Sequence, residues 1–565
     1  MDMLPKGRVH AAFWLLLATA LVGYHLALIF SGLVPNLVSR PLHMAFILPF
    51  ILVLGASGPA SRISGAIIAA LGVAAALWIA LNADRLGDQY GFLEGNFQVA
   101  VAVVLLGVTL EAARRAIGWP LPLVAASALL YGLFGQYIPG QFGHSGTPIN
   151  SFLGTLTIAE GGIWGSLTGV SVGVVSIFVI FGAVLNAGEA GQGFMNVAAA
   201  FAGRLKGGAA KVSVISSALF GSISGSASAN VASTGAITLP AMTKLGYPKR
   251  LAAAVEAVAS SGGQIMPPLM GAGAFVMVEL TGVPYTAIMA AAVLPAFLYF
   301  LAVWVGINAY ARRFDLKGVD AADRPASRDV IITSLFFLVP FTVLLWGMFW
   351  AQFTPEYAAA LAILAGALLL FVNGNLQCKR EQVAARFASA VITAARQVSM
   401  IAAIILCASI IIGVLSITGL GVKVTSLILE GAGGLLWPSL LLTALACLIL
   451  GMEVPTTAAY VLSTITPPVC GAVLIAAGMI GENWLKVALT AMALGIGLYI
   501  IPLGMVANPD MLRLAEAPVA ALIATVRVAL GLTLLSYGLI GARRPVPTVL
   551  MVVGGLCVVF SGLYF

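Results

Sequence analysis

Long apolar runs separated by short polar breaks make up most of this chain, and their lengths predict membrane-spanning helices. A helix needs about 20 apolar residues to cross a hydrocarbon core ~30 Å thick. We expect such helices over residues 11–33, 42–60, 64–82, 97–118, 120–138, 166–187, 284–309, 330–350, 356–373 and 397–419. Two more apolar segments lie within residues 517–565. The pattern predicts an all-α polytopic membrane protein.

One stretch departs from this pattern because it is small and rich in hydroxyls, although apolar sequence lies on both sides. It covers residues 221–240, GSISGSASANVASTGAITLP. Lipid offers no water to polar groups, so such a stretch must line a cavity or coordinate a ligand if it enters the membrane. Basic residues, which collect on the cytoplasmic side, flank both ends: Arg204, Lys206, Lys211, Lys244, Lys249 and Arg250. We therefore expect a re-entrant hairpin over about residues 212–243.

The next crossing, residues 249–281, carries SSGGQIMPP in its middle. Two adjacent prolines remove backbone donors and clash with the preceding helical turn. The sequence predicts a helix that is broken near residues 261–268, with carbonyl groups that helical hydrogen bonds do not use.

The same order of elements recurs in the second half with the opposite charge pattern. Residues 437–470 form a candidate second hairpin with the tip GMEVPTT, and residues 484–506 contain the interrupted stretch GIGLYIIPLG. Few basic residues flank this hairpin, so we expect it to open to the outside. A hairpin followed by a broken helix, twice and with opposite orientation, is typical of inverted-repeat transporters whose substrate site lies between the repeats.

This repeat predicts six regions along the chain. A helical region, a connector with an outside loop, the first repeat, a cytoplasmic loop, the second repeat and C-terminal helices would occupy residues 1–118, 119–165, 166–310, 311–329, 330–516 and 517–565.

Composition supports a membrane protein and excludes a soluble one. Of the 565 residues, 61% are hydrophobic and 8% are charged, and the mean hydropathy is +1.06. The net charge of +8 lies mostly in loops, so it reports topology and indicates no nucleic-acid partner. The five cysteines lack CxxC spacing, and no cleavable signal peptide is evident in the first apolar run.

The polar residues at the breaks are candidates for binding a cation and an anionic substrate. Hydroxyl, amide and carbonyl oxygens suit a hard cation such as Na⁺, and helix N-termini attract anions. The candidate cation ligands are Ser224, Ser226, Ser228, Asn230, Gln264, Thr456 and Thr457. The candidate substrate ligands are Ser222, Ser261, Thr464, Thr466 and Asn508. The alternative is that small residues only allow close helix packing.

Intramembrane carboxylates are costly and indicate function. Glu453, at the second tip, is the best candidate, either as an ion ligand or as a proton carrier. For Glu256 a functional role and a salt bridge to Arg250 are equally open. His25 and His144 are expected to be structural.

Two other classes of protein, an intramembrane protease and a channel, are alternatives to a transporter. Residues 55–58, GASG, match a short motif of intramembrane serine proteases, but His144, the only histidine after Ser57, falls in an outside loop. No HExxH, Walker or CxxC motif occurs, so we expect no enzyme and no cofactor. A channel remains the alternative, although no filter-like sequence or acidic ring is present.

Residues 218–279, ALFGSISGSASANVASTGAITLPAMTKLGYPKRLAAAVEAVASSGGQIMPPLMGAGAFVMVE, closely resemble the large membrane subunit of tripartite ATP-independent periplasmic (TRAP) transporters. The GQIMPP form and the upstream GHSG, residues 143–146, point to the fused TAXI-type permeases. With GMEVPTTAAY and ANPDM, the resemblance covers most of residues 140–515, whereas residues 1–118 fit the family's small subunit by helix count alone.

The resemblance implies a scaffold and an elevator-type transport domain that carries both hairpins. It implies ion-coupled import of a small organic acid across the bacterial inner membrane, by a monomer that receives its substrate from a periplasmic TAXI-type binding protein. Family sodium sites at the tips and broken helices add Gly262, Pro267, Pro455 and Gly497 to the candidates. Glu453 stands where related subunits often carry Asp or a neutral residue. Na⁺ is therefore favoured, and H⁺ stays open.

Overall fold

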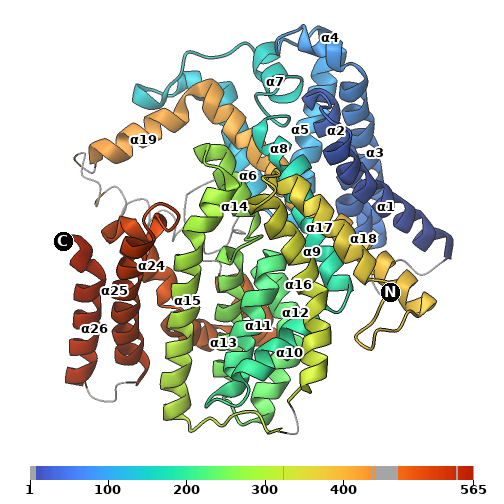
Figure 1. Cartoon of the computed structure of the whole chain (residues 1–565). Helices are drawn as coiled ribbons and strands as arrows, with labels where there is room; N and C mark the ends of the chain where they lie inside the picture. The colour runs from blue at the N-terminus through green and yellow to red at the C-terminus, as the bar shows by residue number, and fades with distance from the viewer. Residues whose placement is uncertain are drawn as a thin grey trace. The chain divides into compact units, whose positions relative to one another are not determined.

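A computed structural model of the chain describes residues 8–321, 324–431, 433, 438, 469–541 and 545–563. These residues are mainly helical and include no strand (Figure 1). Eleven helical segments in this part of the chain are long and apolar enough to cross a membrane. The prediction of an all-α polytopic membrane protein is confirmed. Glu453 and the other residues of the second tip lie outside the described residues.

The helices before the first hairpin are α1 (Arg8–Phe30), α2 (Asn36–Pro49), α3 (Pro59–Leu81), α4 (Ala83–Gly87), α5 (Gly95–Ile117), α6 (Pro120–Phe134), α7 (Ile149–Thr157), α8 (Ser166–Val170), α9 (Ser176–Ala187) and α10 (Ala190–Ala202). The hairpin and the crossings after it comprise α11 (Gly208–Ser224), α12 (Ala227–Lys244), α13 (Lys249–Gly262), α14 (Ala272–Thr281), α15 (Tyr285–Arg313) and α16 (Ser327–Phe349). The remaining described helices are α17 (Pro355–Leu369), α18 (Arg380–Thr418), α19 (Leu420–Gly431), α22 (Val469–Ile480), α23 (Trp484–Leu494), α24 (Gly497–Ala507), α25 (Pro518–Ser536) and α26 (Pro545–Phe560).

Most predicted crossings are confirmed within a few residues, and one starts well before its predicted position. The crossing expected over residues 166–187 is continuous helix over those residues, with a π-helical turn at residues 171–175 between α8 and α9. α18 begins at Arg380, seventeen residues before the predicted start, because its charged first turns continue the helix beyond the apolar run. The sequence analysis did not predict α7, α10 or α19 as separate helices.

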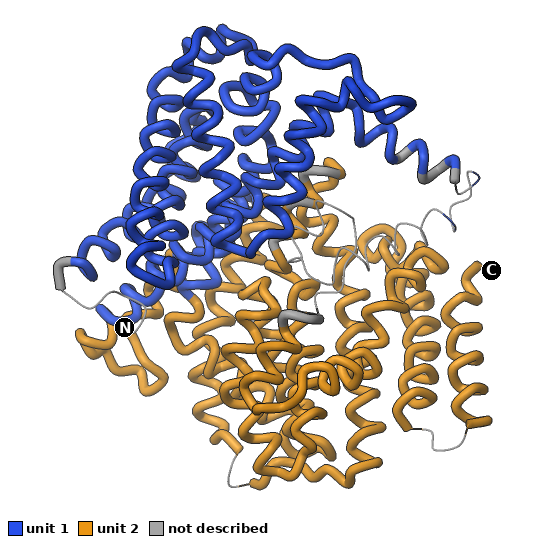
Figure 2. Tube along the Cα trace, turned by 180° about the vertical axis from the view of Figure 1, so that it is seen from behind, with its two compact units in different colours: residues 1–184, 353–363, 384–466 blue, residues 185–352, 364–383, 467–565 orange. Residues whose placement is uncertain are grey.

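The chain forms two compact units (Figure 2). The first unit comprises residues 1–184, 353–363 and 384–466, and the second comprises residues 185–352, 364–383 and 467–565.

In the first unit, α2, α3 and α5 pack together through small residues and one basic side chain. A Cβ at Gly72 would lie 2.7 Å from side-chain atoms of Leu48 and Val108, so the three helices approach closely only because this residue is glycine. Arg115, at the end of α5, donates to the carbonyl oxygens of Leu52 at 2.8 Å and Ser61 at 2.9 Å. The Leu52 carbonyl lies in the last turn before Gly55, where carbonyls lack helical partners, so the guanidinium satisfies it and also joins α5 to the first turn of α3.

The second unit is built around α13, which contacts α11, α12, α15, α22 and α23. Nearly all residues of α13 from Leu251 to Gly262 are buried. α10, α11, α12 and α13 lie side by side next to α15 and α16 (Figure 1). α13 therefore has no face toward lipid over these residues, which lets it carry polar side chains that a lipid-facing helix could not carry.

Candidate functional site

The first hairpin consists of two helices with a two-residue tip. α11 ends at Ser224, α12 begins at Ala227, and the chain reverses at Gly225 and Ser226. Gly225 has φ +58°, a left-handed conformation that glycine adopts without strain. Ser226 caps α12, since its side-chain oxygen accepts from the amide of Ala229 at 3.3 Å. The predicted break in the middle of this polar stretch is confirmed.

The broken crossing packs its backbone directly against this tip. α13 passes into a 3₁₀ turn at residues 263–265, and an irregular segment then runs to α14. A Cβ at Gly221 would lie 2.1 Å from the Cα of Gly263, and one at Gly225 would lie 2.4 Å from the carbonyl oxygen of Met270. The amide of Leu269 donates to the carbonyl of Ser222 at 3.3 Å. Glycines thus bring two non-helical backbone segments together without side chains between them.

Asn230 ties three helices together beneath the tip. Its side chain is fully buried, and its amide nitrogen donates to the carbonyl oxygens of Ser217 on α11, at 2.8 Å, and Ser260 on α13, at 3.5 Å. Its amide oxygen accepts from the hydroxyl of Thr234 at 3.3 Å. Asn230 was predicted as a cation ligand; in this arrangement its amide nitrogen braces the helices.

Two tyrosines of α15 hold the broken crossing in place. The Tyr285 hydroxyl lies 2.6 Å from the carbonyl oxygen of Pro268 and 2.7 Å from that of Leu269, and its ring stacks on Phe275. The Tyr299 hydroxyl donates to the carbonyl oxygen of Val258 at 2.6 Å. These tyrosines fix the backbone path of the crossing on both sides of the break.

The second broken crossing meets the first in the same unit. α23 ends at Leu494 and α24 begins at Gly497, so the interruption predicted within residues 484–506 is confirmed. A Cβ at Gly495 would lie 3.3 Å from a methyl group of Val258 on α13, and one at Gly497 would lie 3.0 Å from the Cβ of Ala302 on α15. The predicted ligand Gly497 therefore lies at a close helix contact beside the first break.

Glu256 lies at the centre of a cluster of hydroxyl groups. Its side chain is fully buried on α13. Oε2 accepts from the Ser213 hydroxyl at 2.8 Å and contacts the Thr238 hydroxyl, and Oε1 contacts the hydroxyls of Thr234 and, at 3.4 Å, Ser260. No described basic side chain lies within ion-pair distance of this carboxyl group. The salt bridge to Arg250 that the sequence left open is therefore wrong.

The four hydroxyl residues of this cluster were not predicted from the sequence, although their spacing carries a signal. On each of the three helices, polar residues are spaced by four positions. They are Ser213 and Ser217 on α11, Asn230, Thr234 and Thr238 on α12, and Glu256 and Ser260 on α13. Side chains spaced by four share one face of a helix. Three polar faces of this kind within buried helices can only be satisfied by facing one another.

Other predicted ligands of the first half lie around the tip with different surroundings. Ser228 is exposed, and the Ser224 hydroxyl lies 3.5 Å from the carbonyl oxygen of Ser226. The hydroxyls of Ser222 and Ser261 are buried and donate to helix carbonyls of Leu219, at 2.6 Å, and Ala257, at 2.8 Å.

The predicted carbonyl ligands lie at the break itself. A Cβ at Gly262 would lie 2.1 Å from the Tyr299 ring. The carbonyl oxygen of Gln264 accepts a hydrogen bond from the amide of Gly271. Pro267 makes no hydrogen bond with any described residue. The carbonyl of Pro267 is thus a group that a cation could use. In the part of the chain described here, no three His, Cys, Asp or Glu side chains cluster as a metal site.

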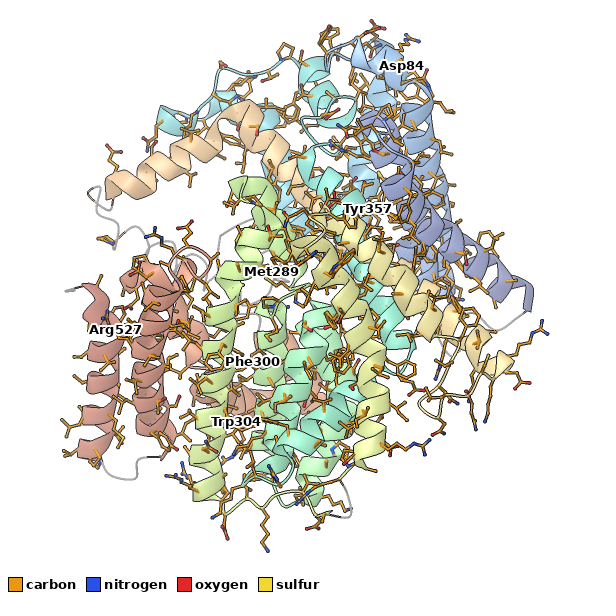
Figure 3. All side chains as sticks on the ribbon, in the orientation of Figure 1. Asp84, Met289, Phe300, Trp304, Tyr357 and Arg527 are labelled. Atoms are coloured by element: carbon orange, nitrogen blue, oxygen red, sulfur yellow. The ribbon has the colours of Figure 1, made fainter. Side chains whose placement is uncertain are left out.

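Asn508 ends α24 and binds the C-terminal helices. Its amide nitrogen donates to Gly504 at 3.0 Å and to Val559 at 2.9 Å, and its amide oxygen accepts from Arg527, labelled in Figure 3, at 3.2 Å. The predicted substrate ligand is thus occupied in fixing α24 against α25 and α26. Six other predicted ligands, Glu453, Pro455, Thr456, Thr457, Thr464 and Thr466, lie outside the described residues.

The histidines of the first unit make structural contacts. His144 lies in a loop, where Nε2 contacts the Tyr131 carbonyl at 3.0 Å and Nδ1 accepts from the Gly146 amide at 3.1 Å. His25 is buried, and its Nε2 lies 2.8 Å from Nδ1 of His43. Ser57 hydrogen-bonds to no histidine of the described residues, so the protease motif gains no nucleophile–base pair here.

Comparison with known proteins gives one family and several relatives. The family described as "Tripartite ATP-independent periplasmic transporter, DctM component" matches residues 102–508. The "C4-dicarboxylate TRAP transporter large permease protein DctM" of Pseudomonas aeruginosa is 30% identical over 210 residues, which cover 36% of this chain and 47% of the relative.

Two further relatives carry other substrates in their names. The "Isethionate TRAP transporter permease protein DctMQ" of Oleidesulfovibrio alaskensis is 28% identical over 290 residues, 47% of this chain and 45% of the relative. The "Ectoine TRAP transporter large permease protein TeaC" of Halomonas elongata is 25% identical over 257 residues, 45% of this chain and 56% of the relative. The chain spans about half the length of the curated relatives it matches.

Proposed function

This chain belongs to the family of the DctM component of tripartite ATP-independent periplasmic transporters, and we propose that it imports small carboxylates by coupling to a cation gradient. It is a multi-pass protein of the bacterial inner membrane. Transport would be secondary, driven by Na⁺ in preference to H⁺, and would proceed by an elevator movement of the domain that carries the hairpins.

The single observation that carries the proposal is the contact between the hairpin tip and the broken crossing. Helix ends in buried positions present partial charges that lipid cannot satisfy, and transporters use such ends to hold ions and substrates. Here the N-terminal end of α12, at Ala227, and the C-terminal end of α13, at Gly262, belong to segments in backbone contact. The first end suits a carboxylate, and the second suits a cation.

The relatives' names favour a small organic anion, which is a carboxylate in two cases and a sulfonate in the third. C4-dicarboxylate, isethionate and ectoine in those names share an anionic group. Backbone amides at a helix N-terminus recognise that group and little else of the molecule. We infer that selectivity resides largely in a separate periplasmic binding protein of the TAXI type, which would deliver its substrate to a monomeric permease.

The proposed cation ligands are grouped by element. The tip contributes Ser224, Ser226 and Ser228, and the first break contributes the carbonyls of Gly262, Gln264 and Pro267. The second tip would hold another ion through Glu453, Thr456 and Thr457. Hydroxyl and carbonyl oxygens match the preference of a hard monovalent cation.

Uptake into proteoliposomes tests the proposal. The full chain is reconstituted with and without a candidate periplasmic binding protein of the TAXI type. A mixture of mono-, di- and keto-carboxylates is supplied, and the accumulated compounds are identified by mass spectrometry. We expect accumulation of one class only when the binding protein is present and an inward Na⁺ gradient is imposed. Uptake that needs no partner and no gradient, and that stops at equal concentrations on both sides, would instead favour a channel.

Ser226→Val provides the residue-level arm of this experiment, and Ser334→Val is its matched control, since Ser334 is a helix-face serine whose hydroxyl donates to its own helix at 2.8 Å. Ser226→Val should abolish Na⁺-dependent uptake while the protein remains monodisperse. Unchanged uptake in Ser226→Val would remove the tip from the cation site.

A further inference from the structure

Glu256 is buried among hydroxyl groups, and it belongs to neither the cation site nor the carboxylate site proposed above. The carboxyl group and its four partners, Ser213, Thr234, Thr238 and Ser260, are each at most 4% exposed. We propose that Glu256 is a proton-binding site that takes up and releases one proton during the transport cycle. This inference rests on the proposed function.

The first support is that no basic side chain among the described residues forms an ion pair with this carboxyl group. The basic residues on helices packed against α13, and on α13 itself, are Lys211, Lys244, Lys249, Arg250, Arg312, Arg313 and Lys486. Lys211 lies over the ring of Trp304, labelled in Figure 3, at 4.8 Å from its centroid, and none of the seven is ion-paired with Glu256 in the described residues. Tyr299, on α15, donates to Val258. A buried carboxyl with no cation is costly when ionised and cheap when protonated.

The second support is a count of protons. Thr234 and Thr238 each have one hydroxyl proton and share two kinds of acceptor: the carbonyl four residues earlier on α12, at 2.8 Å and 3.0 Å, and an oxygen of Glu256. Thr234 also has the amide oxygen of Asn230 and the Ser217 hydroxyl within reach, each at 3.3 Å. When the carboxylate is ionised, both threonines donate to it. When it is protonated, Glu256 donates to one of them, and that threonine donates to its helix carbonyl. Hydroxyl protons rotate freely, so one set of heavy atoms satisfies both forms.

The same contacts argue against a metal ion inside the cluster. A bound cation separates its ligand oxygens, because each of them contacts the ion and not its neighbours. Here the Ser213 hydroxyl lies at hydrogen-bond distance, 2.8 Å, from Oε2, and the contacts of Thr234 and Thr238 are at least as close. At these distances the hydroxyl groups donate directly to the carboxyl oxygens, as they do around a proton-binding site.

The cluster is connected to the hairpin tip through Thr234. The Thr234 hydroxyl lies 3.3 Å from the Ser217 hydroxyl and 3.3 Å from the amide oxygen of Asn230, the residue that braces the helices below the tip. When Glu256 gains or loses its proton, the acceptor to which the Thr234 hydroxyl donates changes. Proton binding is therefore coupled to the geometry of the tip, as a driving-ion site requires. The proton comes from water on one side and returns to water on the other, so only an O–H bond forms and breaks.

Infrared difference spectroscopy tests the site without any substrate. The full chain in lipid nanodiscs is titrated with acid and base, and the carbonyl stretch of a protonated carboxylic acid is followed. We expect a reversible band that is lost in Glu256→Gln and retained in Glu381→Gln, a change at an exposed glutamate. A band unchanged in Glu256→Gln, or the absence of any titrating band, would overturn the proposal.

A second variant covers the case in which Glu256→Gln folds poorly. Thr238→Val keeps the shape of the side chain and removes one donor, so it should shift the pH at which the band appears. In uptake experiments under the inward Na⁺ gradient, an additional inward proton gradient should stimulate wild-type transport and leave Glu256→Gln unaffected. Wild-type uptake that ignores the proton gradient would overturn the coupling and leave the transporter function intact. No uptake under any gradient would refute the proposed function, and the infrared result would still decide whether Glu256 exchanges a proton.

Discussion

Single polar side chains hold the second unit together because they are buried where water cannot replace them. Asn230 is the clearest case. Its amide nitrogen donates to carbonyl oxygens on two neighbouring helices, and its amide oxygen accepts from the Thr234 hydroxyl. Removing one partner of a buried hydrogen bond leaves the other unsatisfied, which costs more than the bond itself contributes. The residue therefore has a structural role in addition to any role in ion binding.

Asn230→Ala should lower the free energy of unfolding by about 1–3 kcal/mol, because two buried carbonyls lose their side-chain donor. The measurement is the Tm of the purified protein in detergent. Ser228→Ala, at an exposed position of the same helix, is the control and should leave the Tm nearly unchanged. Equal Tm values for both variants would show that Asn230 braces nothing.

At the scale of elements, close contacts through glycine decide how the hairpin meets the broken crossing. Gly221 and Gly263 touch through backbone atoms, which cannot rotate away as a side chain can. Tyr285 holds the other end of the crossing through two carbonyls. The polar tip is thus supported from both ends of the segment that faces it.

Gly221→Ala should destabilise the protein by about 3 kcal/mol, the upper range for an overpacked site, because its Cβ would clash with backbone. Gly191→Ala is the matched control, since its Cβ would meet only Phe220 at an ordinary 3.9 Å and alanine favours the helix. Denaturant or thermal unfolding of the two variants compares them directly. A stable Gly221→Ala protein would contradict the backbone contact.

Tyr285→Phe should loosen the segment after the first break by about 1 kcal/mol, since the phenyl ring keeps its packing and loses only the hydroxyl. Hydrogen exchange measured by mass spectrometry should then show faster exchange in a peptide that contains Leu269 and Met270. Tyr310→Phe, on the same helix, should leave that peptide unchanged. Identical exchange in both variants would mean that the hydroxyl does not restrain the segment.

The elements that lipid dictates could be predicted from sequence, and those that tertiary contacts dictate could not. The breaks at Gly225 and Gly495 were predictable because glycine, serine and proline interrupt otherwise apolar runs. The start of α18 was not, because hydropathy reports where a helix meets lipid and not where it begins. The surroundings of Glu256 were missed because its partners come from three helices, and a sequence does not show which helix faces meet.

At the scale of the whole molecule, basic loops fix the orientation of the chain in the membrane. Arg312 and Arg313 end α15, and Lys379 precedes α18, whereas the α16–α17 connection carries no basic residue. Short loops rich in Arg and Lys stay in the cytoplasm.

Labelling of single cysteines from one side tests this orientation. In a background that keeps only Cys378, which is exposed, a membrane-impermeant maleimide should react only after the cells are opened. Thr354→Cys, in the α16–α17 connection, should react in intact cells. The reverse pattern would invert the topology of both repeats.

The backbone contact between the hairpin tip and the broken crossing also determines how the binding of one ligand affects the binding of another. Because Gly221 abuts Gly263 and the Ser222 carbonyl accepts from Leu269, neither segment can shift without displacing its neighbour. A ligand that orders one segment also orders the other, so a second ligand loses less conformational entropy when it binds. By thermodynamic linkage, each ligand changes the binding free energy of the other by the same amount. Binding of the cation would thus raise the affinity for the carboxylate by the same factor by which the carboxylate raises the affinity for the cation. Titrations of each ligand with and without the other can measure both factors.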